Sequence, residues 1–218
     1  MNTTAADTFE RMDSMYRYQR YFYDATRKFY LLGRDRLLDS IDADGALSVV
    51  EIGCGTGRNL QILASRRPER HFYGLDASAE MLETAAAKLA SEEIANVRLE
   101  TALAGDFHHR LTFGRVEPFD AAFFSYSISM IPDWRSAFQN AIANVRPGGA
   151  IYIVDFYDQQ DLPVWFQRLL KWWLSKFHVR FWDELMPYLH SLERNGQGSL
   201  KIVPVARRYA FIAEFRKL

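Results

Sequence analysis

The chain has 218 residues, of which 49% are hydrophobic and 25% charged, a composition typical of one soluble globular domain with a full core. Its 27 lysines and arginines equal its 27 aspartates and glutamates, which disfavours general binding of nucleic acids, because phosphates require a basic surface. The single cysteine, Cys54, excludes an internal disulfide and a cysteine-rich metal site, and a polar N-terminus without a long apolar run favours a cytoplasmic protein.

The N-terminal part of the chain is rich in tyrosine. Residues 9–40 have a helical pattern that predicts two helices interrupted near Gly33. Tyr16, Tyr23 and Tyr30 recur every seven residues, which places them along one stripe of a helix. Such a stripe most often docks a helix on the core. The alternative is that one of these tyrosines faces a ligand cleft.

A glycine-rich motif follows the first predicted strand, residues 48–52. Gly53, Gly55 and Gly57 alternate along it, and Glu51 stands two residues before the first glycine. Alternating glycines let the backbone bend tightly and approach a ligand closely. In the dinucleotide-binding fingerprint the third glycine comes one residue later and seats a pyrophosphate on a helix N-terminus. The spacing here favours a ligand without phosphates.

The second predicted strand, residues 71–75, ends in an acid. Asp76 lies 19 residues beyond Gly57. An acid at this tip is suited to accept hydrogen bonds from the two ribose hydroxyls of an adenosine. Ser78 is suited to cap a helix at 79–90. The alternative interpretation is that Asp76 serves only as a cap for that helix.

The rest of the chain continues this alternation of strands and helices. Each strand is nearly continuously apolar, which predicts an α/β fold with a doubly wound, mostly parallel sheet. The carboxyl ends of its strands bring Gly53, Asp76 and Ser125 to one cleft. His108 and His109 lie in a polar loop with the wrong spacing for a metal, so no metal is expected. The remaining strands are predicted at 97–101, 119–126, 150–156, 200–205 and 208–215, a turn at 146–149, and helices at 59–65, 134–145, 162–177 and 183–193.

The predicted helix at 162–177 is unusual for its tryptophans and its charge. Residues 165, 166, 169, 170, 173 and 177 form a broad apolar face, and Arg168, Lys171 and Ser175 lie opposite. From Leu162 to Trp182 there are four basic residues and no acid. This pattern favours contact with an anionic membrane surface or a lipid-binding groove. A core helix with a solvated basic back is an equally good interpretation.

The acid-x-Gly-x-Gly-x-Gly motif, together with the acid after the second strand, resembles class I S-adenosylmethionine-dependent methyltransferases. The resemblance implies a seven-stranded Rossmann-like core at 46–218, with a helical insertion at about 160–195 and a helical lid at 1–45. Family members often carry an adenine-binding acid after the third strand, where this chain has Ala102 or Leu103. The implied cofactor-binding residues are Glu51, Gly53, Cys54, Gly55, Gly57, Asp76, Ala77, Met81, Leu103 and Ser125, and the catalytic candidates are Tyr126, Tyr23 and Tyr16.

Four segments are similar to the bacterial N-methyltransferase of betaine-lipid synthesis. They are residues 15–38, 124–134, 145–156 and 162–179. This resemblance implies three methylations of the amine of diacylglyceryl-homoserine and contact with the inner membrane surface. Four cations near the lid are candidates to pair with the homoserine carboxylate: Arg17, Arg20, Arg27 and Lys28.

Other functions fit the same motifs. One is methylation of another amine, such as phosphatidylethanolamine or a soluble amine. A second is a non-catalytic subunit that only binds the cofactor. A third, a nicotinamide reductase, is opposed by the spacing of the glycines. Tyr126 has two equally good interpretations, as a residue beside the reacting methyl group or as part of the core.

Overall fold

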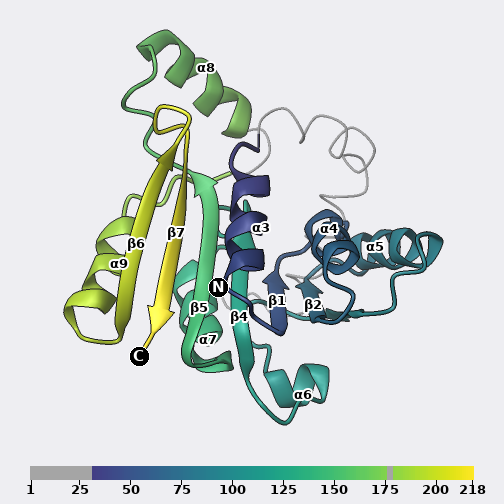
Figure 1. The fold of residues 1–218 in the computed structure, drawn as a ribbon. Coiled ribbons are helices and arrows are strands. Elements are labelled where there is room, and N and C mark those ends of the chain that lie inside the picture. The colour runs from purple at the N-terminus through teal and green to yellow at the C-terminus, as the bar shows by residue number, and fades with distance from the viewer. Residues whose placement is uncertain (1–30, 176–178) are drawn as a thin grey trace, which may run out of the picture.

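The computed structural model describes residues 31–175 and 179–218 (Figure 1). Within these ranges seven strands form one sheet in the order β3-β2-β1-β4-β5-β7-β6. Neighbouring strands are parallel, except that β7 runs antiparallel to β5 and β6. The predicted mostly parallel sheet is thus confirmed. Its strands are β1 Ser48–Ile52, β2 His71–Asp76, β3 Val97–Thr101, β4 Phe119–Ser125, β5 Val145–Phe156, β6 Gly198–Val205 and β7 Ala210–Lys217.

Helices cover both faces of the sheet (Figure 1). One layer contains α3 (Arg34–Ala43), α4 (Arg58–Arg66), α5 (Ala79–Ser91) and α8 (Val164–Ser175). The other contains α6 (His109–Phe113), α7 (Trp134–Asn144) and α9 (Leu185–Arg194). Two hydrophobic clusters therefore flank the sheet, which explains why the central strands are apolar at nearly every position.

The strands alternate side chains between these two clusters. In β1, Val49 packs in the cluster with α3 and α4, whereas Val50 packs in the cluster with α7. In β4, Phe123 and Phe124 divide in the same way, and all four side chains are fully buried. Each strand therefore contributes to both cores through its two-residue period.

The order of the strands creates a switch point beside β1. The chain runs from β1 outward through β2 to β3, and then returns to form β4 on the opposite side of β1. The connections leave β1 and β4 in opposite directions, and in doubly wound folds the ligand crevice lies beyond the carboxyl ends of two such strands. The glycine-rich loop follows β1 and Tyr126 follows β4, which places both at this crevice.

Two local predictions were wrong. The expected turn at 146–149 is the first part of β5, and the pairing of β4 with β5 shifts register between Phe119 and Ala121. Gly148 lies in this irregular part of β5 and has a left-handed backbone conformation, with φ of 73°. The expected loop around His108 contains the short helix α6, because His108 Nδ1 accepts a hydrogen bond from Arg110 N at 3.1 Å and caps it.

The helical prediction for residues 9–40 is only partly covered by the structure. Helix α3 begins directly after Gly33, which has a φ of 88°, so the start of the second predicted helix is confirmed. Residues 1–30 lie outside the described ranges, and so does most of the predicted lid. Among the described helices, none combines the length and the apolar character needed to cross a membrane.

Candidate functional site

The backbone of the glycine-rich loop bends at positions where any residue other than glycine would be strained. Gly53 and Gly57 have φ of 74° and 73°, in the left-handed region that favours glycine. A Cβ on Gly53 would lie 2.7 Å from Cβ of Ser127, and one on Gly57 would lie 2.9 Å from Cβ of Ala85. The loop therefore packs against the turn after β4 on one side and against α5 on the other.

Asp76 connects this loop to the end of β2. One oxygen of its carboxylate accepts a hydrogen bond from Gly55 N at 2.8 Å, and the other accepts from Ser78 N at 2.9 Å. Ser78 Oγ accepts from Met81 N at 3.4 Å and is the N-cap of α5, as predicted. Asp76 thus has a larger structural role than capping, since it links two separate crossover loops. Its carboxylate is 8% exposed and is held rigidly at the crevice.

Two carboxylates make the loop electronegative. Glu51 is buried beneath it, and Glu51 Oε1 accepts a hydrogen bond from Asn59 Nδ2 at 2.7 Å. Burial raises the pKa of the Cys54 thiol well above its usual value, and the charges of Asp76 and Glu51 raise that pKa further. This field favours a cationic ligand, and it keeps Cys54 as a protonated packing residue.

The residues predicted to edge an adenine lie next to Asp76. Ala102 N donates a hydrogen bond to the main-chain oxygen of Asp76 at 3.1 Å, so the loop after β3 begins directly beside the acid. Ala77 and Leu103 are half-buried, whereas Met81 in the first turn of α5 is buried. Asp106, an alternative to the missing acid, is exposed.

At the end of β4, Ser125 and Tyr126 have different environments. Ser125 Oγ is buried and has no hydrogen-bond partner among the residues that the structure describes. The Tyr126 hydroxyl donates to Leu32 O at 2.6 Å, and the Tyr126 backbone has φ of 55°. Burial, followed by the charge of Asp155, raises the pKa of Tyr126 well above its usual value. Tyr126 is therefore suited to positioning, and the role predicted for it beside the methyl group stays a prediction.

Two residues of the site were missed from the sequence. Ser127 Oγ donates to Ile52 O at 2.7 Å and ties the turn after β4 to the end of β1. Asp155 in β5 is 1% exposed and accepts hydrogen bonds from Ser129 N at 3.0 Å and from Phe156 N at 2.8 Å. No sequence pattern marks either residue, because each acts on main-chain groups far away along the chain.

Several expected site residues lie outside the described ranges. They are Tyr16 and Tyr23 together with Arg17, Arg20, Arg27 and Lys28. Within residues 31–175 and 179–218, no group of three histidine, cysteine, aspartate or glutamate side chains is arranged to hold a metal ion. The described part of the site suits a ligand that combines hydroxyl groups with positive charge.

Comparison with known proteins gives the family of the chain. A family model described as "Methyltransferase domain" matches residues 43–192. The trans-aconitate 2-methyltransferase of Azoarcus sp. (strain BH72) is 29% identical over 117 residues, which are 54% of this chain and 42% of that protein. The enzyme of the same name from Deinococcus radiodurans is 31% identical over 105 residues, which are 48% of this chain and 36% of that protein. The chain thus spans less than half the length of these curated relatives.

Solved structures agree with the observed fold. A complex of DhpI with SAM and HEP has a TM-score of 0.65 and 21% identity, with 99% of this chain and 100% of that chain covered. A possible histamine N-methyltransferase from Thermotoga maritima has a TM-score of 0.69 and 17% identity, with 95% and 100% covered. At these identities the likeness shows a shared fold.

Replacing Asp76 tests the adenosine half of the site. We expect Asp76→Ala to weaken binding of S-adenosylhomocysteine roughly tenfold to a hundredfold, since a hydrogen bond to a charged group contributes about 1.5–3 kcal/mol. Calorimetric titration measures this change. Ser78→Ala, which removes only the helix cap, is the matched control and should lower the unfolding midpoint more than the affinity. Affinity within twofold of the wild type in Asp76→Ala would exclude the ribose contact.

Replacing Asp155 tests whether its buried carboxyl makes the stability of the fold depend on pH. Burial raises the pKa of Asp155 to about 6. The folded state therefore keeps a proton that the unfolded state loses, and stability falls as pH rises from about 4 to 6. In the wild type this fall in the free energy of unfolding is expected to be roughly 3 kcal/mol, and we expect Asp155→Asn to abolish it. Urea unfolding at several pH values measures the difference.

Asp120→Asn provides a control of opposite sign for that measurement. Burial opposes ionisation of Asp120, but hydrogen bonds from Arg146 and Ser48 outweigh it and lower the pKa of this carboxyl. Its contribution is therefore lost as pH falls, and the variant should lose less stability on acidification than the wild type. A shift of the same sign in both variants would contradict the assignment of Asp155.

The matched family model, the seven-stranded sheet and the crevice lead to one conclusion. The rigid carboxylate of Asp76, the electronegative loop and the Ser125 hydroxyl, which has no hydrogen-bond partner among the described residues, lie at the strand ends where the predicted cofactor would bind. The chain belongs to the methyltransferase domain family, whose model matches residues 43–192.

Proposed function

We propose that this enzyme methylates the amine of diacylglyceryl-homoserine three times and forms a betaine lipid at the inner membrane surface. The outward face of α8 is the observation that carries the proposal. Trp165, Leu169 and Trp172 expose 69%, 53% and 56% of their surface there, and Arg168 and Lys171 are exposed between them. Tryptophans interleaved with cations suit the headgroup region of an anionic membrane.

The same helix also has an inward face. Leu170 and Leu174 are buried against the core, and Phe166 and Trp173 pack beside them. The predicted single apolar face is therefore divided, because Trp165 and Leu169 point outward. A helix with apolar residues on both sides has more apolar surface than the domain covers, and this favours a lipid surface as the second partner.

The residues of the crevice have separable tasks in methyl transfer. S-adenosylmethionine, when bound, supplies a methyl group that is already activated, so alignment is the main requirement. Asp76 holds the ribose and Glu51 supports the loop at the methionine end. The acceptor amine must be neutral to react. The apolar wall of Tyr126 and Phe156, whose ring centroids are 4.8 Å apart, favours the neutral amine by desolvation.

Methylation of a soluble carboxylate is a second candidate, favoured by the names of the matched trans-aconitate methyltransferases. Those matches cover less than half of each relative. Methylation of phosphatidylethanolamine or a soluble amine, and cofactor binding without catalysis, are further alternatives. These functions differ in the acceptor that is methylated, so one assay with several acceptors distinguishes them.

Incubation with methyl-labelled cofactor tests the acceptor. Diacylglyceryl-homoserine, phosphatidylethanolamine, trans-aconitate and glycerylhomoserine, which lacks acyl chains, would be supplied separately to the full chain. We expect label in the trimethylated homoserine lipid, with mono- and dimethyl forms at early times. Thin-layer chromatography and mass spectrometry identify the products.

Label in phosphatidylcholine or in the trans-aconitate ester would replace the proposed acceptor by that compound. An absence of label in every arm, with S-adenosylhomocysteine still bound, would favour the non-catalytic subunit. Asp76→Ala is the control for dependence on the cofactor site, and it should lose labelling of whichever acceptor reacts.

Membrane contact through α8 is tested separately by flotation with vesicles that contain anionic lipid. We expect Trp165→Ser with Trp172→Ser to reduce the floating fraction at least fivefold, because both indoles are exposed. Leu111→Ser with Val116→Ser is the matched control, since these side chains are exposed by 86% and 72% on another part of the molecule. Equal flotation of the two double variants would exclude α8 as the contact.

A further inference from the structure

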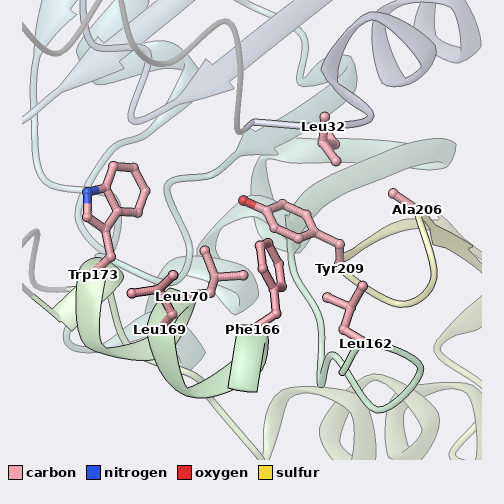
Figure 2. A pocket seen from close by; sticks show the side chains of 8 residues that line it. All are labelled: Leu32, Leu162, Phe166, Leu169, Leu170, Trp173, Ala206 and Tyr209. Atoms are coloured by element: carbon pink, nitrogen blue, oxygen red, sulfur yellow. The ribbon is translucent and has the colours of Figure 1, made fainter. Parts of the chain in front are cut away.

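An apolar hollow of about 550 Å³ lies between α8 and the turn that joins β6 to β7 (Figure 2). Figure 2 shows Phe166, Leu170 and Trp173 of α8 pointing toward Leu32 and Tyr209 on the other side. Its size falls within the range of about 300–1,000 Å³ that is typical of small-molecule sites. The hollow is thus large enough for a ligand and has an almost entirely hydrocarbon lining.

The wall of the hollow is in contact with the residue that follows β4. The side chain of Leu32 lines the hollow, while its carbonyl oxygen accepts the hydrogen bond from the Tyr126 hydroxyl. A row of aromatic rings makes the same connection, from Tyr126 to Phe156 at 4.8 Å and from Phe156 to Tyr209 at 5.8 Å between centroids. Leu32 directly, and Tyr209 through Phe156, therefore connect the wall of the hollow with Tyr126.

A polar group is buried behind the wall of this hollow. Gln159 is fully buried, and neither atom of its side-chain amide has a hydrogen-bond partner among the described residues. Its backbone is anchored to two segments that line the hollow, since Leu162 N donates to Gln159 O at 3.0 Å and Gln159 N donates to Arg208 O at 2.9 Å. Gln159 itself does not line the hollow, so its amide lies outside the space that is open to a ligand.

We propose that this hollow, which we call the acyl hollow, binds one acyl chain of the lipid acceptor. The proposal rests on the proposed lipid substrate and names its binding site. In the proposed function the exposed cations and tryptophans of α8 face a membrane surface, and the inward face of the same helix lines the hollow opposite Leu32, which Tyr126 contacts. Each buried methylene is expected to strengthen binding roughly fourfold.

A variant that fills the hollow tests the proposal. Ala206 lines the hollow and is exposed, so Ala206→Phe adds volume without disturbing the core. Arg207→Phe is the matched control, because both residues lie in the same turn with φ of 48° and 56°. Dipalmitoyl and dioctanoyl forms of diacylglyceryl-homoserine would be compared at fixed mole fraction in detergent micelles.

We expect Ala206→Phe to raise the ratio of KM for the dipalmitoyl lipid to KM for the dioctanoyl lipid at least tenfold, while Arg207→Phe leaves the ratio within twofold of the wild type. An unchanged ratio in Ala206→Phe would overturn the acyl hollow even if the lipid is methylated. Binding of S-adenosylhomocysteine, measured in parallel, verifies that both variants keep the folded crevice.

Direct binding separates failure of the hollow from failure of the proposed function. A diacylglycerol brominated on its acyl chains has no amine, and it quenches tryptophan fluorescence on contact. We expect saturable quenching of Trp173, obtained as the difference between the wild type and Trp173→Phe, and a tenfold weaker interaction in Ala206→Phe. Such binding without methylation of any homoserine lipid would contradict the proposed acceptor alone. An absence of quenching at Trp173 would contradict the hollow.

Discussion

The two hydrogen bonds that the Asp76 carboxylate accepts hold the crevice in shape. They join Gly55, in the loop after β1, to Ser78, at the start of α5. These segments belong to different crossovers and would otherwise be related only through the sheet. Since the acid is fixed before any ligand arrives, little conformational entropy remains to be lost on binding. The same carboxylate thus serves the fold and is the group predicted to bind the ribose of the cofactor.

The opposite wall of the crevice is fixed in an equivalent way by main-chain contacts. Ser127 bonds to the last residue of β1, and Asp155 bonds to the turn after β4. Together with the close approach of Gly53 to Ser127, these contacts leave the two walls little freedom to move apart. The methyl-transfer end is therefore built from strand ends that are braced on both sides, which suits a reaction that depends on alignment.

Local sequence patterns were sufficient to predict several strands of the sheet. Strands β1 and β3 were predicted with the bounds that the structure has, because β1 contains a short apolar run and β3 alternates apolar with polar residues. The start of β5 was missed, since Pro147 and two glycines indicate a turn wherever the register shift of the sheet is unknown. Helix α6 was missed because it buries a single residue, Phe113, and so has no helical period.

The site was predictable only where function is carried by short motifs. The glycines and Asp76 follow such a motif, whereas the partner of Tyr126 lies 94 residues away in sequence and no local pattern reveals it. Gln159 was missed for the same reason, because burial of its amide depends on the packing of the β6–β7 turn.

The double role of Leu32 has a geometric consequence. Its carbonyl holds Tyr126 at the reacting end, and its side chain forms part of the acyl hollow, so the two places are separated by the dimensions of one residue. Under the proposed function, this fixed separation would select among acceptors by length. A lipid whose spacer between amine and acyl chain is longer or shorter would enter the hollow yet hold its nitrogen out of line with the methyl group.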